Sequence, residues 1–395
     1  MSEAPGSRLL LGSSTASLRE AVLPTYARAD VTIVRGEGCR VWDDAGRSYL
    51  DFGTGIAVVG LGHCEPRVTA AAQAQLELLW HASNLYWTEP MLRLAGLLTE
   101  RLGGGQAFFC NSGAEANEAA LKYARKATGR PRIVALEGGF HGRTFGALSA
   151  TGQPAKWEGF GPLLPGVAFA PPNDVEALER AVSPGGDVAV VLLEPVLGEG
   201  GVISLDPAFA RAAAEVAREV GALLCLDEVQ TGVGRTGTFF AHEQLGLEPD
   251  LVTLAKGLGN GLPIGALLVA ERVAGGLAPG DHGSTFGGNP VACAAACAVV
   301  EAIDEELLAN VRERGAELRA GLARMAGVIE TRGAGLLVGA RLDRSASAVV
   351  DACRAQGLLA LSAGEDVLRL APPLVVGRAE VEEALGIVNG ALATT

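Results

Sequence analysis

Two polar residues each follow a short apolar segment, where they could support chemistry. Lys256 comes directly after the apolar residues 251–255, and Asp227 after 223–226. Lysine is rarely buried without a partner, and burial lowers its pKa, so that the amine becomes a nucleophile able to form a Schiff base. A buried carboxylate can hold a positive charge. The pair indicates amine chemistry beside a stabilised cation. The alternative is a lysine and an acid at solvated strand ends.

Lysine is scarce in this chain, which makes the position of Lys256 informative. The 395 residues include 32 Lys and Arg, of which only Lys122, Lys126, Lys156 and Lys256 are lysines. A coding bias explains the scarcity, but arginine stays protonated and forms no imine. Lys122 and Lys126 follow Glu118 on a helical segment, so we predict that they form surface ion pairs.

A possible anion site lies at Asn111–Ala114, between a predicted strand over 107–110 and a predicted helix over 115–128. Free N–H groups at a helix N-terminus, the close approach that Gly113 permits and the hydroxyl of Ser112 suit a phosphate. On this segment alone, an ordinary helix capped by Ser112 or Asn111 is the more frequent arrangement.

A glycine-rich segment over 137–144 offers further ligand contacts. Phe140 or His141 can lie flat on a ring, and Arg143 can bind a carboxylate in a bidentate manner. The alternative is a turn with a core aromatic. The five histidines show no ligand spacing, and no second Cys/His pair stands near Cys293 and Cys297, so we predict no metal site.

The segment 232–237, Gly-Val-Gly-Arg-Thr-Gly, matches the G-x-G-x-x-G pattern of dinucleotide-binding proteins. That fingerprint requires glycines that open a helix directly after a strand. Here two acids and two other polar residues intervene, and no helical start follows. We therefore reject a dinucleotide-binding dehydrogenase, the main alternative from another class of enzyme, and interpret the segment as a reorienting loop.

The elements that must position these residues alternate from about residue 63 onward. Predicted strands lie at 107–110, 132–136, 188–194, 223–227, 251–254 and 266–270, with helices such as 115–128 and 206–220 between them. This alternation predicts a mostly parallel sheet covered on both faces, with ligands at the carboxyl ends of its strands. Residues 31–52 form a predicted antiparallel meander. A helix capped by Asn289-Pro290 and a mixed tail from about 305 complete the chain.

Composition excludes several classes of protein. The chain is 49% hydrophobic with a net charge of -13, so it is folded and unsuited to nucleic acids or anionic membranes. It contains no run of about 18 apolar residues and no signal-peptide core, so we expect no membrane association. Seven cysteines, an odd number, indicate reduced thiols and a cytoplasmic location.

A phosphate site, a stacking ring, a buried acid and a buried lysine together suit pyridoxal 5′-phosphate, on which the acid keeps the pyridine nitrogen protonated. The sequence resembles the class III (ω-) aminotransferases of fold type I over nearly its whole length. The matching segments are SGAEANEAALKYAR, FHGRT, EPVLGEGGV, LDEVQTGVGRTG, LAKGLGNGLPIGA and GSTFGGNP. A non-catalytic relative would be expected to lack the lysine or the acid.

The resemblance implies an α/β fold with two domains and a homodimer with shared active sites. The large domain, 63–289, holds a mostly parallel seven-stranded sheet between helices. A smaller α+β domain is built from both termini, with 1–62 as its N-terminal part and 290–395 as the connecting helix and C-terminal part.

The resemblance also implies roles for individual residues. Lys256 is the expected catalytic residue, and Asp227 pairs with the pyridine nitrogen. The other expected cofactor contacts are Ser112, Gly113, Ala114, Phe140, Glu228, Val229, Gln230 and, from the partner subunit's copy, Thr285. The expected substrate contacts are Arg143, Glu199, Ser284, Arg369 and Ile56.

The expected substrates follow from the charged positions. Arg143 matches a residue that binds the carboxylate far from the reacting amine. Arg369 receives an α-carboxylate, and Glu199 pairs with it when none is present. Ile56 offers no contact to a free α-amine and so favours an N-acylated donor, first N2-acetyl-L-ornithine with 2-oxoglutarate. Succinylornithine, succinyl-diaminopimelate, carrier-bound lysine and 4-aminobutyrate are alternatives. Leu197 is expected to make the acyl side of the pocket less polar.

Overall fold

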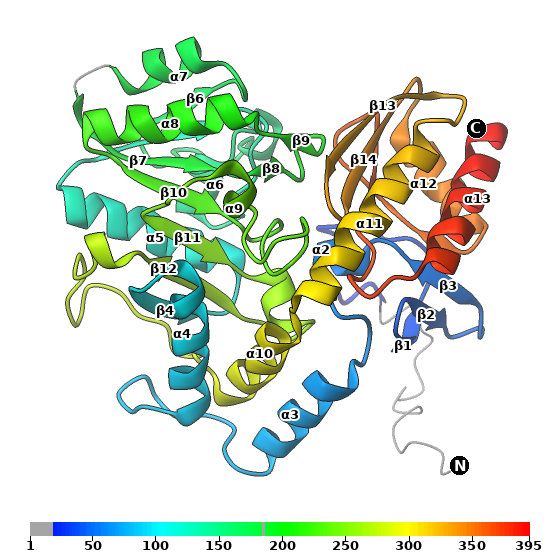
Figure 1. The fold of residues 1–395 in the computed structure, drawn as a ribbon, viewed down its shortest axis with the longest axis horizontal. Helices are drawn as coiled ribbons and strands as arrows, with labels where there is room; N and C mark the ends of the chain where they lie inside the picture. The colour runs from blue at the N-terminus through cyan, green and yellow to red at the C-terminus, as the bar shows by residue number, and fades with distance from the viewer. Residues whose placement is uncertain (1–18, 184–185) are drawn as a thin grey trace.

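The computed structural model describes residues 19–183 and 186–395, and Figure 1 shows two lobes side by side. The larger lobe contains a seven-stranded sheet in the order β4-β12-β11-β10-β7-β5-β6. Only β12 runs antiparallel to its neighbours, which confirms the predicted mostly parallel sheet. In that order its strands are Gln106–Cys110, Gly265–Val269, Leu251–Leu254, Leu223–Asp227, Val188–Leu193, Arg132–Leu136 and Val167–Ala170.

Helices cover both faces of this sheet. Alanine-rich α5 (Gly113–Thr128) packs on one face. On the other face, α7 (Val175–Val182) covers β6, and α8 (Pro207–Val220) covers β7 and β10. Farther along the same face, α4 (Glu89–Leu102) covers β4 and β12, and α10 (Pro290–Ala302) belongs to the same apolar cluster as β11 and β12. Since both faces are buried, the strands are almost continuously apolar. The other helical segments of this lobe are α3 Pro66–Leu76, α6 Phe145–Ala150, η1 Pro154–Lys156, α9 His242–Leu245, η3 Lys256–Gly259 and η4 Glu271–Val273.

The smaller lobe combines the segments near both ends of the chain. One sheet has the order β1-β2-β3-β15, from Ile33–Glu37, Arg40–Asp43, Ser48–Asp51 and Leu358–Leu359. A second has the order β13-β14-β17-β16, from Val328–Ala334, Leu337–Leu342, Val367–Leu370 and Leu361–Ser362. Its helices are α2 Thr54–Ala57, α11 Glu305–Leu322, α12 Ala346–Ala355 and α13 Arg378–Thr394, and a two-stranded ribbon (β8 Val196–Leu197, β9 Ile203–Ser204) faces it from the large lobe.

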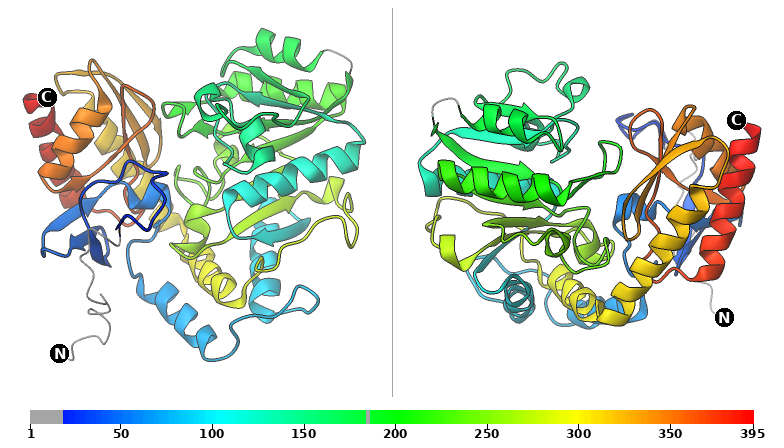
Figure 2. Two further views of the ribbon diagram at one scale, coloured as in Figure 1. Left: turned by 180° about the vertical axis from the view of Figure 1, so that it is seen from behind. Right: turned by 45° about the horizontal axis from the view of Figure 1, so that its top comes forward.

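The connection between the lobes was predictable from local signals. Asn289 caps α10 by accepting hydrogen bonds from the N–H groups of Val291 and Ala292, and Pro290 occupies the first turn. From α10 the chain enters α11, which runs along the smaller lobe (Figure 1, Figure 2). β15 pairs in parallel with β3, so segments near both ends of the chain build the smaller lobe together. The division at residues 62 and 290 stays a proposal, and its residues 1–18 lie outside the described residues.

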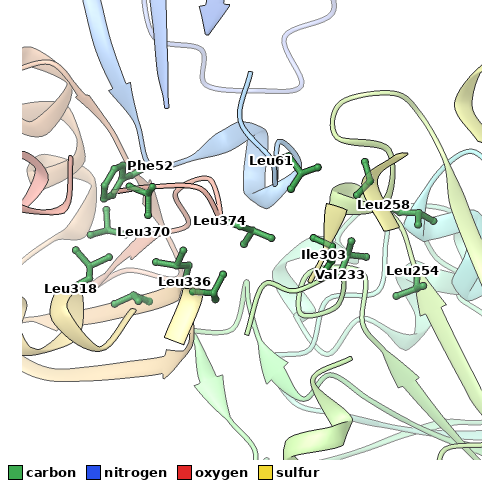
Figure 3. Packing of buried hydrophobic residues seen from close by; sticks show 14 of the residues in the cluster. Phe52, Leu61, Val233, Leu254, Leu258, Ile303, Leu318, Leu336, Leu370 and Leu374 are labelled. Atoms are coloured by element: carbon green, nitrogen blue, oxygen red, sulfur yellow. The ribbon is translucent and has the colours of Figure 1, made fainter. Parts of the chain in front are cut away.

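A single apolar cluster spans the two lobes. Figure 3 shows Val233, Leu254 and Leu258 of the large lobe near Ile303, with Leu374 leading on to Leu336 and Leu370 of the small lobe. Burial of such side chains stabilises each by about 1.5–3 kcal/mol relative to exposure. The lobes are therefore joined by a continuous core. Within residues 19–183 and 186–395, no helix combines the length and apolar character needed to cross a membrane.

Candidate active site

A pocket of about 380 Å³ lies where β10 and β11 end and α5 begins. Its position agrees with the rule that ligands of open α/β sheets bind beyond the carboxyl ends of the strands. Its lining includes Asn111, Ser112, Gly113, Ala114, Asn117, Phe140, His141, Arg143, Glu194, Asp227, Val229, Gln230 and Lys256. Residues from five separate stretches of the sequence thus meet in one cavity.

Lys256 follows β11 and opens the short helix η3. Its φ of 45° lies in the left-handed region, which is unusual for a residue with a side chain and concentrates at functional sites. Burial lowers the pKa of Lys256, and the charge of Arg369 lowers it further, against the opposing effect of Glu199 and Asp227. The lowered pKa favours the neutral, nucleophilic amine.

Asp227 is the centre of a buried hydrogen-bond network. Its Oδ2 accepts from Asn117 Nδ2 and from His141 Nδ1, both at 2.7 Å, and its Oδ1 accepts from the N–H of Val229 at 3.0 Å. Thr253 donates to Asn117 Oδ1 at 2.8 Å, which orients the amide. The network holds a carboxylate in the pocket wall with a fixed orientation.

Three residues in or beside this network were not predicted as functional from sequence: Asn117, His141 as the partner of Asp227, and Glu194, which interacts with Asp227 and His141 through its charge. Burial works to lower the pKa of His141, but the hydrogen bond and the charge of Asp227 raise it overall. Glu194 accepts from the N–H groups of Phe140 and Gly198, and burial raises its pKa to about 7. The sequence signal for Asn117 was an asparagine near the start of a predicted helix, inside the first turns rather than at the cap.

The N-terminus of α5 forms one end of the pocket. Ser112 is its cap, accepting from the N–H of Glu115 at 3.2 Å and donating to that carboxylate at 2.9 Å. The N–H groups of Gly113 and Ala114 have no acceptor within the helix. A Cβ at position 113 would come within 2.7 Å of Val229, so only glycine allows the helix to approach so closely. The segment is both a capped helix and an anion cradle.

A buried arginine lies on the small-lobe side of the pocket. Arg369, in β17, is 2% exposed and donates to the carbonyl of Gly198 at 3.0 Å, to Glu199 at 2.5 Å and to Gln230 Oε1 at 3.2 Å. Burial works to raise the pKa of Glu199, but the charge and hydrogen bond of Arg369 lower it overall. The carboxylate of Glu199 is therefore ionised and neutralises Arg369.

Arg143 and Phe140 form the outer part of the site. Arg143 is exposed, and its guanidinium carbon lies 5.7 Å from the centre of the Phe140 ring. Phe140 is held by its backbone N–H, which donates to Glu194 at 2.7 Å. A cation over an aromatic face at the pocket edge is available to an incoming carboxylate.

Glu228 requires a correction, because its carboxylate does not line the pocket. It is 1% exposed and accepts from the N–H groups of Ala241 and His242 and from His242 Nδ1 at 2.7 Å. Adjacent residues at a strand end point to opposite faces, so Asp227 and Glu228 cannot both face the cavity. Glu228 organises the loop beyond β10.

Ile56 and Leu197 also differ from expectation. Ile56 is 40% exposed and does not line the pocket, whereas its neighbour Val58 does. Leu197 is fully buried and packs in the core beneath α7 and α8. It therefore does not make the acyl side of the cavity less polar, because it never reaches the cavity.

Ser284 and Thr285 lie outside the main pocket. They line a separate hollow with His81, Asn84 and Leu85. Ser284 Oγ accepts from Asn111 Nδ2 at 3.2 Å, which ties this segment to the start of the anion cradle. Their predicted role in a partner subunit's site stays a prediction.

The predicted pairing of Glu118 with Lys122 is wrong. Glu118 instead accepts from the N–H groups of Gly146 and Ala147, at the start of α6. Lys122 and Lys126 both contact Asp281. Backbone donors at a helix start satisfy a partly buried carboxylate better than an exposed lysine does.

The glycine-rich segment 232–237 joins the lobes. Arg235 is 3% exposed and donates to the carbonyls of Leu336 and Pro372, and the N–H of Leu336 donates back to its carbonyl at 3.0 Å. Burial lowers the pKa of Arg235 to about 10. No long helix opens here, as expected from the rejected dinucleotide pattern.

The residues present fit pyridoxal 5′-phosphate. The free N–H groups of α5 suit its phosphate, the carboxylate of Asp227 suits a protonated ring nitrogen, and Lys256 offers the amine. The chain belongs to the class-III aminotransferases, because the family described as aminotransferase class-III matches residues 24–392, and it is thus a pyridoxal-phosphate-dependent enzyme. It transfers an amino group between a small-molecule donor and a keto acid.

Three similar proteins indicate which class-III aminotransferases this chain resembles. Acetylornithine aminotransferase of Thermosynechococcus vestitus is 48% identical, covering 96% of this chain and 97% of that protein. The crystal structure of N-acetylornithine aminotransferase from Stenotrophomonas maltophilia K279a has a TM-score of 0.83 at 40% identity, covering 96% and 98%. Ornithine aminotransferase from Toxoplasma gondii ME49 has a TM-score of 0.91 at 34% identity, covering 96% and 94%.

Proposed function

We propose that this enzyme transfers the δ-amine of N2-acetyl-L-ornithine to 2-oxoglutarate, giving N-acetylglutamate 5-semialdehyde and glutamate, as a step of arginine biosynthesis. The observation that carries the proposal is the contact of buried Arg369 with Glu199, beside a pocket that is also lined by Arg143. One end of the pocket can thus accept either an uncharged chain or a carboxylate. The names of the similar proteins support the same donor.

Each site residue has a proposed task. Pyridoxal 5′-phosphate, when bound, supplies an electron sink at the carbon that bears the amine. Ser112, Gly113 and Ala114 bind its phosphate, Phe140, Val229 and Gln230 orient its ring, and Asp227 holds a proton at its nitrogen. Lys256 Nζ holds the cofactor and moves a proton to and from the substrate carbon.

The substrate is proposed to lie between two charged ends. Arg143 binds the carboxylate that is distant from the reacting amine. Arg369 binds the α-carboxylate of glutamate or 2-oxoglutarate, for which Glu199 must move aside. With acetylornithine, Glu199 stays in place and avoids an unpaired buried guanidinium. Neither Ile56 nor Val58 can hydrogen-bond to a free α-amine, which supports an acylated donor over ornithine.

The test of this proposal is a comparison of amino donors with the holoenzyme and 2-oxoglutarate. N2-acetyl-L-ornithine is expected to give a higher kcat/KM than each of the other donors: succinylornithine, succinyl-diaminopimelate, ornithine, lysine and 4-aminobutyrate. A pocket that hydrogen-bonds a hydroxyl or amine of its substrate strongly rejects donors that lack this group. An apolar pocket discriminates between donors by only about 10–200-fold per group. A higher kcat/KM for ornithine or 4-aminobutyrate would contradict the proposal.

Replacing Glu199 with alanine is expected to separate the two half-reactions. Arg369 would be left as an unpaired buried cation whenever the substrate brings no α-carboxylate. We expect the acetylornithine half-reaction to slow at least about tenfold more than the glutamate half-reaction. Single-turnover kinetics measures each separately. Glu330→Ala, which removes an exposed partner of Arg332 in β13, is the control. Equal losses in both half-reactions would exclude the switch.

A homodimer is the proposed assembly. Between α3 and α4, large side chains are exposed, with Trp80 at 68% and Trp87 at 80%. Asn84 in this segment donates to the carbonyls of Ser284 and Gly287. The exposed apolar segment is therefore hydrogen-bonded to the loop that contains Thr285. Extended apolar exposure of this kind marks protein interfaces. Association here would bring Thr285 to the partner subunit's site.

Replacing Trp87 with glutamate is expected to convert the dimer to monomers and to lower activity in parallel, because a buried interfacial charge without a partner is costly. Sedimentation velocity measures the assembly. Ile329→Glu, which also adds a charge at a 53% exposed apolar position, in β13, is the matched control and should stay dimeric. A dimer that survives Trp87→Glu would place the interface elsewhere.

A cytoplasmic location is also proposed. All seven cysteines are free in the structure, and five of them are buried. Free thiols are typical of reducing compartments.

A further inference from the structure

Two cations gather at the ring of Phe140, which lines the pocket, without an ion-pair partner among the described residues. Lys156 Nζ and the guanidinium carbon of Arg143 each lie 5.7 Å from the centre of the Phe140 ring. In the part of the chain that the structure describes, neither side chain makes a hydrogen bond or an ion pair. A cation–π contact at an exposed site is worth about 0.5–1 kcal/mol, which is too little to explain why two like charges gather at one ring.

The backbone at Lys156 is rigidly placed beside this ring. The following residue, Trp157, donates through its indole N–H to the carbonyl of Thr151 at 2.8 Å. Gln153 donates to the carbonyl of Gly138 at 2.9 Å, two residues before Phe140. Lys156 ends the short helix η1 between these anchors. Its amine therefore approaches the Phe140 ring from a fixed base.

The charge of Lys156 interacts with the charges of Arg143 and Glu199. Burial lowers the pKa of Lys156, and the like charge of Arg143 lowers it further, whereas Glu199 acts in the opposite direction. Lys156 in turn contributes to the lowered pKa of Glu199. An anion bound between Lys156 and Arg143 would remove their mutual repulsion.

We propose that Lys156 is a second carboxylate-binding residue, which acts with Arg143 on the substrate carboxylate that lies away from the reacting amine. This inference rests on the proposed function, because it assigns a contact within the same site. It applies to the α-carboxylate of N-acetylornithine and to the γ-carboxylate of 2-oxoglutarate, which both occupy that end. Two cations discriminate in favour of a carboxylate over an uncharged end more strongly than Arg143 alone.

The experiment uses the holoenzyme with Lys156→Met, which keeps the aliphatic stem and removes the charge. We expect KM for N-acetylornithine and for 2-oxoglutarate to rise about tenfold, the effect of one lost charged hydrogen bond, with kcat changed less than about twofold. N-acetyl-1,4-diaminobutane, which lacks the carboxylate, should react unchanged. The Kd of glutarate, measured by titration calorimetry, should also rise about tenfold. Lys156→Arg should restore both values.

Arg180→Met is the matched control, because Arg180 is an exposed cation of α7 whose ion-pair partner among the described residues is Glu176. Unchanged KM and glutarate Kd in Lys156→Met, with both raised in Arg143→Met, would overturn the inference. So would an equal effect on N-acetyl-1,4-diaminobutane, which indicates a structural role. A rise in KM confined to 2-oxoglutarate would also contradict the inference and would indicate that Lys156 acts through Glu199 instead. If wild type does not use N-acetylornithine, the proposed function fails, and glutarate binding still tests Lys156.

Discussion

Replacing Lys256 with alanine is expected to lower kcat by at least about 10⁴-fold, the upper range for a lost acid–base group, because no other lysine of the described residues lines the pocket. Lys156, the other lysine near the site, lies 5.7 Å from the centre of the Phe140 ring and does not line the pocket. The residue at 256 adopts a φ of 45°, which alanine tolerates about as well as lysine because both carry a Cβ. The variant should therefore fold, and its steady-state kinetics can be compared directly with wild type.

Two further variants serve as controls for this result. Lys256→Arg keeps the charge and the stem but cannot lose its proton, so it should be equally inactive. Lys126→Ala removes an exposed lysine of α5 and should keep full activity, since Lys122 still holds Asp281. Both pocket variants should still bind pyridoxal 5′-phosphate through the start of α5, as measured by equilibrium dialysis. More than about 1% of wild-type activity in Lys256→Ala would contradict the assignment.

Replacing Asp227 with asparagine is expected to lower kcat by about 10²–10³-fold, the range for one lost electrostatic contact in a buried site. The amide carries no charge to hold a proton at the ring nitrogen. It also places an N–H₂ group among three donors, from Asn117, His141 and Val229, so that at least one hydrogen bond is lost. Stopped-flow measurement of a single half-reaction reports the loss at the chemical step.

Asp250→Asn provides the matched control at the opposite end of the same sheet. Asp250 precedes β11, accepts from the N–H of Leu224 at 2.8 Å and pairs with Arg272 at 2.9 Å. This substitution should reduce stability by about 1 kcal/mol and leave kcat nearly unchanged. If both variants lose activity alike, the effect of Asp227→Asn is one of folding rather than chemistry. A measured melting temperature for each variant separates the two.

Much of the fold was predictable because its signals are local. The strands at 132–136, 223–227 and 251–254 were predicted with their observed bounds, since apolar runs bounded by glycine and acidic residues are decided within a few residues. Asn289-Pro290 likewise predicted the start of α10. The pocket position followed from one general rule, that the carboxyl ends of parallel strands lie at one edge.

The errors arose where a side chain had a choice of partners. Asp227 and Glu228 are adjacent acids that point to opposite faces, and the packing of β10 against its neighbours decides which of them faces α5. Leu197 was placed in the pocket because of its neighbours in the sequence, but β8 directs it into the core. Glu118 was paired with a lysine on its own helix, whereas the start of α6 offers it two backbone donors. Each outcome depends on a segment distant in sequence.

By itself, the sequence determined the class of fold, the cofactor and the residues that bear the main chemistry. Lysine is rare here, and no other residue combines a nucleophilic amine with the end of an apolar strand. Only the tertiary structure decided how several of these residues are supported: Asn117 and His141 contact Asp227, and Lys156 lies beside the same ring as Arg143. The reason is physical. Burial and hydrogen bonding set the charge and orientation of each group, and both depend on which distant segments the fold brings together.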